Sequence, residues 1–307
     1  MKQKSQRFWN CTYSFGYLLL YAVSLGLLYK VQHFDVSEPL FVLMVLGVGF
    51  SVLAWWTTRS FVPLPLDVKK PGRETMILLA YLVALAVFIT WGLPAVGALV
   101  PTEPWKSVSI LAAKLAAFVV VPMVLFCPLG YTVHNFFGTP SQWRQHLAPG
   151  LWMALFLILF QAVFGRGLSE IRHSSLPART LLLGVPFTYV WLLVEVGLVE
   201  EFFFRCLLQS RLSTLLRSQA GGTVLASLLF GLAHAPGLYL RPGGTQEAVG
   251  AHPSWLMAVG YSIVITSVAG VFLGVLWART RNLLLVMAVH AAGDWLPNLL
   301  PTIRNWF

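Results

Sequence analysis

Charged residues are scarce in this chain. Only 10% of its 307 residues are charged, whereas 57% are hydrophobic. A soluble domain carries about 25% charged residues. A soluble protein of this length could not cover its surface with so few charges, so the composition excludes an ordinary soluble protein and favours insertion into a membrane.

Cysteine is also rare. The three cysteines, Cys11, Cys127 and Cys206, form an odd and widely spaced set. Such a set provides neither a disulfide framework nor the C-x-x-C spacing of a metal site. We therefore predict no structural disulfides, and we predict no cofactor.

Nucleic-acid motifs are missing, although the net charge is +10. No groove-like pattern of aromatic and basic residues occurs either. Membrane proteins gather Lys and Arg in their short loops, where these residues also attract anionic lipid headgroups. The basic balance therefore indicates a lipid bilayer as partner and no nucleic acid.

Long apolar runs replace the missing charge. Several contain 18 or more residues, the length that crosses a hydrocarbon core about 30 Å thick. Short polar or Pro/Gly-containing connectors separate them, and no repeat or soluble domain is evident. We predict an all-α, polytopic transmembrane bundle of about eight or nine helices forming one continuous membrane domain. The runs cover residues 12–30, 39–57, 75–100, 107–127, 148–164, 180–204, 220–239, 254–278 and 283–300.

Topology follows from the ends and the loops. Residues 1–10 are basic and precede an apolar run without an evident cleavage site, which indicates a retained first helix rather than a signal peptide. With nine spans, the side of the membrane that holds the N-terminus receives more Lys and Arg than the other side. We therefore place the N-terminus in the cytoplasm and the protein in the cell membrane.

Ionisable residues inside the spans concentrate in the last four helices, where each would cost several kcal/mol without a partner or water. The first cluster is Glu200-Glu201 with Arg205. Glu201 and Arg205 are at i and i+4, so they share a helix face and can form an ion pair. Glu200 lies about 100° away, in a separate environment. Different environments can separate two carboxylates into an acid and a base. The alternative is an ion pair that only fixes helix register.

Two histidine clusters follow. His234 comes one turn after Phe230, near a helix end to which Pro236 is expected to contribute. His290 and Asp294 are at i and i+4, so the carboxylate can orient the imidazole. Each cluster has a structural alternative, a packing histidine in the first case and a polar contact between helices in the second. Together the three clusters supply a base, an Arg to tune it, and imidazole donors. This combination suits water activation and oxyanion stabilisation.

The three clusters resemble the CPBP family, which contains CAAX prenyl endopeptidases of the Ras-converting type together with Abi and bacteriocin-processing relatives. The family pattern is Glu-Glu-x-x-x-Arg, then Phe-x-x-x-His, then His-x-x-x-Asn or Asp. The resemblance covers about residues 195–294 and implies an intramembrane glutamic-type endopeptidase, a hydrolase. Residues 176–307 would then hold the catalytic helices, and residues 1–175 would hold transmembrane helices of unassigned role.

The resemblance also implies roles for the site residues. Glu200 and His234 would activate the attacking water, and His290 and Asp294 would line the oxyanion side. Glu201 and Arg205 would support the first pair. Position 294 holds Asp where the prenyl-protease branch has Asn, so Asp294 is an alternative orienting group for His290. The substrate would be a membrane-associated protein or peptide, CAAX-like, a precursor or a sorting tail.

Alternative functions remain open at this point. Two His and one Glu can hold zinc, so an intramembrane metalloprotease is the nearest one. Intramembrane Glu, Arg and His also mark ion pathways, so a non-catalytic transporter or immunity protein is another. Outside the three clusters, Lys114 is expected to snorkel toward a span end. Glu195 precedes the Glu pair by a turn and a half, and its role is undecided.

Overall fold

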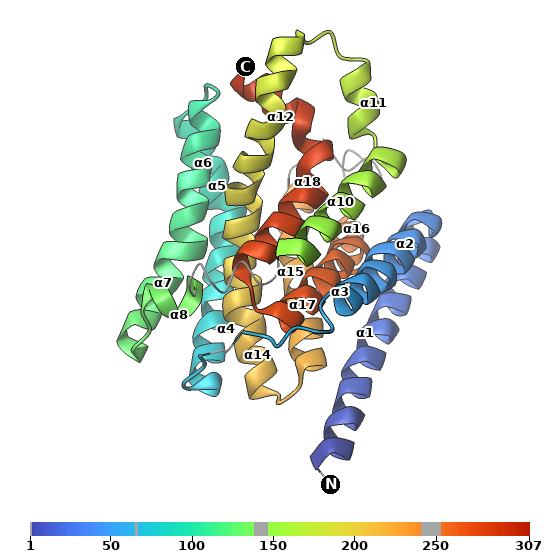
Figure 1. The fold of residues 1–307 in the computed structure, drawn as a ribbon, viewed down its shortest axis with the longest axis vertical. Helices are drawn as coiled ribbons and strands as arrows, with labels where there is room; N and C mark the ends of the chain where they lie inside the picture. Colours follow the sequence, from blue (N-terminus) through green and yellow to red (C-terminus); the bar gives the residue numbers. More distant parts are fainter. Residues whose placement is uncertain (1, 65–66, 138–146, 241–252) are drawn as a thin grey trace. The chain divides into compact units, whose positions relative to one another are not determined.

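The structure is a computed structural model that describes residues 2–64, 67–137, 147–240 and 253–307. Regular structure in these ranges is helical, and none of the described residues forms a strand. The predicted all-α, multi-pass architecture is therefore confirmed, as Figure 1 shows.

Nine helical stretches in the described ranges are long and apolar enough to span a membrane. Each overlaps one predicted apolar run, which makes the chain an integral multi-pass membrane protein. The predicted cell membrane and cytoplasmic N-terminus stay predictions. The stretches are Phe8–Val31, Ser37–Thr57, Pro71–Leu99, Trp105–Leu129, Leu147–Phe164, Ala178–Leu215, Gln219–Leu240, Trp255–Thr280 and Leu283–Trp306.

The helices pack as two compact units, which are described separately. Unit 1 comprises Met1–Gly92 and Phe204–Arg281, and unit 2 comprises Leu93–Phe203 and Asn282–Phe307. The predicted division at residue 175 concerns function rather than packing, so it stays a prediction.

Unit 1 contains the first two spans, most of the third, the end of the sixth, and the two spans that precede the last. Its α15 packs against α1, α14, α16 and α17. The elements are α1 (Lys2–Gln32), α2 (Ser37–Val42), η1 (Leu43–Phe50), α3 (Ser51–Thr57), α4 (Pro71–Val87), η2 (Phe88–Gly92), α14 (Ser210–Leu215), α15 (Gln219–Leu240), α16 (Trp255–Tyr261), η8 (Ser262–Thr266) and α17 (Ser267–Thr280). The segments η1, η2 and η8 are π-helical.

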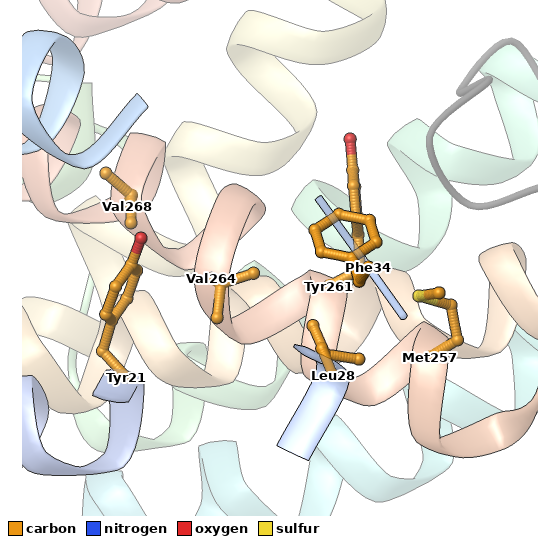
Figure 2. Close-up of a cluster of buried hydrophobic side chains, with 7 residues drawn as sticks. All are labelled: Tyr21, Leu28, Phe34, Met257, Tyr261, Val264 and Val268. Carbon is orange, nitrogen blue, oxygen red and sulfur yellow. The ribbon is translucent and has the colours of Figure 1, made fainter. Parts of the chain in front are cut away.

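An apolar cluster joins α1 to α16, η8 and α17 in unit 1. Figure 2 shows Tyr21 and Leu28 of α1 beside Tyr261 and Val264. The Tyr21 hydroxyl donates to the carbonyl of Pro39 over 2.7 Å. A buried tyrosine thus contributes its ring to the core while its polar end is satisfied, as an environment without water requires.

A buried ion pair joins α4 to α14. Arg211 Nε lies 3.1 Å from Glu74 Oε2, and the two side chains are 2% and 0% exposed. Arg211 Nη1 also donates to the Cys206 carbonyl. This internal pairing lets the sixth span continue to Leu215, whereas the sequence predicted an end near residue 204.

The expected effect of Pro236 on α15 is wrong. The helix continues through Pro236 and ends at Leu240. Proline removes only one helix hydrogen bond, here the one to the Leu232 carbonyl. Transmembrane helices tolerate that loss when neighbouring groups compensate. His234 lies near the end of this helix, as predicted, six residues before Leu240.

Unit 2 is built around the last helix, α18, which packs against α10, α11, α12 and η5. Side chains of neighbouring helices donate to backbone carbonyls of α18, among them Gln161 to Gly293 and Tyr189 to Ala288. The elements are α5 (Leu93–Leu99), α6 (Trp105–Leu115), η3 (Ala116–Val120), α7 (Val121–Phe126), η4 (Cys127–Leu129), α8 (Val133–Phe137), α10 (Leu147–Phe164), α11 (Gly167–Arg172), α12 (Ala178–Leu192), η5 (Leu193–Leu198), α13 (Val199–Glu201) and α18 (Leu283–Trp306), while η6 (Phe202–Gln209) crosses into unit 1.

Gly197 brings η5 close to α18. A Cβ atom at this position would lie 2.9 Å from the carbonyl oxygen of Met287. Real Cβ atoms do not approach a backbone oxygen so closely, so only glycine permits this contact between the two helices.

Gly197→Ala is therefore expected to destabilise the protein by about 1–3 kcal/mol, the range found for overpacking in a close-packed core. Unfolding of the detergent-solubilised protein by heat or denaturant measures the change. Gly16→Ala is the matched control, because a Cβ at Gly16 meets nothing within 4 Å. It should leave stability unchanged or raise it by up to about 1 kcal/mol through helix propensity. Equal stability of the two variants would contradict the proposed close contact.

Candidate active site

The helix that carries the Glu pair is not a regular α-helix. Glu200 and Glu201 lie in α13, a short α-helical piece with π-helical segments on both sides, η5 before it and η6 after it. The sequence predicted an ordinary α-helix here. A π-helical turn bonds residue i to i+5 and holds more residues than an α-turn, and such turns occur frequently at functional sites.

Glu201 and His290 are in direct contact. His290 Nδ1 lies 2.7 Å from Glu201 Oε1, and the side chains are 11% and 0% exposed. A carboxylate oxygen accepts, so Nδ1–H donates. This bond connects α13 to α18 within unit 2 and fixes the plane of the imidazole ring.

Asp294 lies on the other side of the same ring. Its Oδ2 is 3.6 Å from His290 Nε2, and its side chain is 39% exposed. A separation of 3.6 Å is too long for a hydrogen bond, so the contact is electrostatic. The hydrogen bond to Glu201 therefore orients His290 more strongly than this contact does. The predicted catalytic roles of His290 and Asp294 stay predictions.

Glu200 is half-buried, unlike its neighbour Glu201. It lies close enough to His290 to interact with it electrostatically. The two adjacent carboxylates thus have different environments: Glu201 is buried and bonded to His290, and Glu200 is partly accessible.

Arg205 and His234 belong to unit 1, where both contact Phe230. The Arg205 guanidinium carbon lies 4.7 Å from the centre of the Phe230 ring. The centre of the His234 ring lies 4.8 Å from the centre of the Phe230 ring. The centre of the Phe204 ring lies 5.2 Å from the same point. Arg205, Phe230 and His234, three of the five residues in the first two family motifs, therefore form one packed cluster with a cation–π contact.

His234 has a defined tautomer. Its Nδ1 lies 2.8 Å from the carbonyl oxygen of Phe230, one turn earlier in α15. A carbonyl oxygen only accepts, so Nδ1 carries the proton. The lone pair of the neutral ring is then on Nε2, and this is the nitrogen that can accept a proton.

The predicted site residues thus fall into two sets. Glu200, Glu201, His290 and Asp294 come together in unit 2, and Arg205 and His234 come together in unit 1. The predicted convergence of all six residues, including the Glu201–Arg205 ion pair, stays a prediction.

Sequence reasoning missed one pair of charged residues. Lys114 Nζ lies 2.9 Å from Glu195 Oε1, and Trp191 Nε1 donates to Glu195 Oε2 over 2.7 Å. The expectation that Lys114 snorkels is wrong. It lies nine residues inside the span Trp105–Leu129, hence about 14 Å from its start at 1.5 Å per residue, beyond the reach of a lysine side chain. Two opposite charges at mid-span in different helices were the signal that could have revealed the pair.

The described residues were expected to offer a zinc site only through Glu and His side chains. Among them, no group of three or more His, Cys, Asp or Glu side chains is arranged to hold a metal ion. The contact between Glu201 Oε1 and His290 Nδ1 is a hydrogen bond in length. Two atoms that share a tetrahedral zinc at about 2.1 Å would lie about 3.4 Å apart. These two atoms therefore bind each other rather than a shared ion.

Comparison with known proteins gives one family match. Residues 182–296 match the family model described as Type II CAAX prenyl endopeptidase Rce1-like. The match covers a little more than a third of the chain and contains all six predicted site residues. Comparisons with curated proteins and with solved structures gave no match. Residues 182–296 are thus similar to the Rce1-like CAAX prenyl endopeptidases, which confirms the resemblance that the three motifs indicated and implies a protease.

Proposed function

We propose that this protein is an intramembrane endopeptidase of the glutamic type that cleaves membrane-associated substrates. The observation that carries the proposal is the hydrogen bond between Glu201 and His290, 2.7 Å long. It joins two family motifs that are 89 residues apart in the sequence, within the segment that matches the CAAX endopeptidase model. A buried carboxylate that orients an imidazole is a catalytic arrangement, because it fixes which ring nitrogen acts on the substrate.

In the proposed reaction, Glu200 takes a proton from water, and the resulting hydroxide attacks the peptide carbonyl. The partial exposure of Glu200 supports this role, because a base must reach water, while Glu201 is buried and bonded. His234 would accept a hydrogen bond from the same water through Nε2, which its tautomer leaves as the acceptor. The proton that Glu200 carries then passes to the leaving amine as the tetrahedral intermediate collapses.

His290 would stabilise the oxyanion of that intermediate through Nε2–H, which requires the ring to be protonated on both nitrogens, a form that the neighbouring carboxylates of Glu201 and Asp294 favour. Its other nitrogen already donates to Glu201, so the ring cannot rotate freely. Fixed donors aimed at a developing charge are the most effective form of such stabilisation, since they need no reorganisation during the reaction. Asp294 lies at 3.6 Å from Nε2. It is proposed to help hold this side of the ring, and Arg205 is proposed to support the Glu pair.

The proposed substrate is a membrane-associated protein or peptide with a CAAX-like carboxy-terminal sequence. The description of the matching family model supports this class over precursors and sorting tails. A cleavage site at the end of a lipid-anchored tail also suits a site formed inside membrane spans, because the anchor holds the peptide at the bilayer.

Glu200→Gln should reduce kcat by about a hundredfold or more, because the amide cannot accept the proton of water, and general-base catalysis contributes at least this much. Cleavage of a farnesylated CAAX peptide by the protein in proteoliposomes measures the loss, and thermal unfolding tests that the variant still folds. Glu170→Gln, at an exposed position of α11, is the control and should retain full activity. Normal cleavage by Glu200→Gln would contradict the proposed function.

Glu201 and His290 should behave as one functional pair. We expect Glu201→Gln and His290→Gln each to lower kcat/KM. The double variant should have nearly the same kcat/KM as the less active single variant, because either change already destroys the pair. The measurement is a double-mutant cycle with the same peptide. Additive losses would show that the two residues act independently.

Metal dependence separates the proposed mechanism from the zinc alternative. A glutamate-activated water needs no metal, so prolonged treatment with a strong chelator, followed by removal of the chelator, should leave the cleavage rate unchanged. Elemental analysis of the purified protein checks the same point. Loss of activity on chelation with recovery on adding zinc would favour the metalloprotease instead.

A further inference from the structure

The pair Lys114–Glu195 is an ion pair between the middle parts of two predicted membrane spans. Lys114 belongs to α6, and Glu195 belongs to the π-helical segment η5. Glu195 uses both carboxylate oxygens, Oε1 for Lys114 at 2.9 Å and Oε2 for Trp191 at 2.7 Å. The pair touches none of the proposed catalytic side chains in these contacts, yet ionisable groups at this depth are costly and are usually functional.

The position of η5 in the chain gives the pair its significance. Before η5, Trp191 packs against Trp306 of α18 with ring centres 4.8 Å apart. After η5, Glu201 bonds to His290, also of α18. The segment η5 therefore lies between two residues that contact α18, Trp191 before it and Glu201 after it. The number of residues per turn in η5 therefore determines which of the following side chains faces His290.

A π-helical turn holds about one residue more than an α-helical turn, and one residue corresponds to about 100° of rotation. If η5 became α-helical while the Trp191 contact stayed fixed, every later residue would rotate by about one residue step. Glu200 would then occupy the direction that Glu201 now has. The π-helical form of η5 therefore assigns Glu201, rather than Glu200, to His290.

We propose that Lys114, through its ion pair with Glu195, holds η5 in the π-helical form and so positions Glu201 against His290 while leaving Glu200 to act on water. Lys114 reaches η5 from a separate helix, so its attraction acts on the side of η5 rather than along its axis. Glu195 is the group that receives this attraction, and Trp191 orients it. Lys114 and Glu195 are thus positioning residues. Their effect on catalysis rests on the proposed function, whereas their effect on helix register does not.

Activity gives the first test. Lys114→Met and Glu195→Gln should each lower kcat for the farnesylated CAAX peptide, with a loss on the order of a hundredfold, as expected when reacting groups are misplaced by about 1 Å or more. KM should change little, because the pair does not bind the substrate. The exchanged pair Lys114→Glu with Glu195→Lys should recover much of the activity, since it restores the attraction.

Lys106→Met is the matched control, because Lys106 lies on the same helix α6, two turns before the lysine that pairs with Glu195. It should retain wild-type kcat. Full activity of Lys114→Met or of Glu195→Gln would overturn a positioning role in catalysis. Failure of the exchanged pair to recover any activity, in a variant that unfolds at the wild-type temperature, would also overturn it.

Thiol cross-linking gives a second test that needs no catalysis. In a background with Cys11, Cys127 and Cys206 replaced by Ala, cysteines at 201 and 290 should be joined by a short bifunctional reagent when Lys114 is intact. With Lys114→Met, cross-linking should shift toward cysteines at 200 and 290. Mass spectrometry identifies the linked peptides. An unchanged cross-linking pattern overturns the inference even if Glu200→Gln is inactive. A shifted pattern supports it even if the proposed protease function fails.

Discussion

Hydrocarbon offers no partner to a polar group, and the organisation of this protein depends on that constraint. An ionisable side chain within a span must find its counterpart on another helix or within a polar cavity. The pairs Glu201–His290 and Lys114–Glu195 satisfy this requirement between helices of unit 2, and a fully buried carboxylate–guanidinium pair does so in unit 1. Each pair also fixes which helices lie together. The contacts that hold the bundle together are therefore of the same type as the contacts between groups that could perform chemistry.

Much of the fold could be predicted from the sequence, because hydrophobic length is a local property. All nine apolar runs coincide with helical spans in the described ranges. The sequence also allowed Glu201 and His290 to be selected as site residues, since each is an ionisable residue in an apolar helix. What the sequence could not provide was the pairing. Helical periodicity suggested Arg205 for Glu201 and Asp294 for His290, because it describes only neighbours on the same helix. The contact between Glu201 and His290 is a tertiary one.

The failures of sequence reasoning have physical causes of the same kind. Lys114 was assigned to the membrane surface because its partner Glu195 is 81 residues away, and only packing brings the two together. Pro236 was expected to end a helix because an isolated helix cannot compensate for the missing donor. Inside a bundle, neighbouring helices can compensate. The π-helical segments around the Glu pair could not be recognised from the sequence, because one polar residue in η5 (Glu195) and two in η6 (Arg205 and Gln209) are too few to distinguish a π-helical period from an α-helical one.

The boundary between the two units falls between Phe203 and Phe204, inside η6. Arg205 therefore packs with the unit that contains His234, although only four residues separate it from Glu201. A single helix thus carries Glu200 and Glu201 on one side of this boundary and Arg205 on the other.

The extra residue in η5 has a consequence for comparing sequences. A relative with a plain α-helix at this place would need one residue fewer between Trp191 and Glu200 to present the same carboxylates to its last helix. An alignment of the two would then require a one-residue gap in an apolar segment where nothing else signals it. An alignment without this gap, matched over the residues before the Glu pair, would align Glu200 of this protein with the second glutamate of the relative. The roles of the two glutamates would then be exchanged.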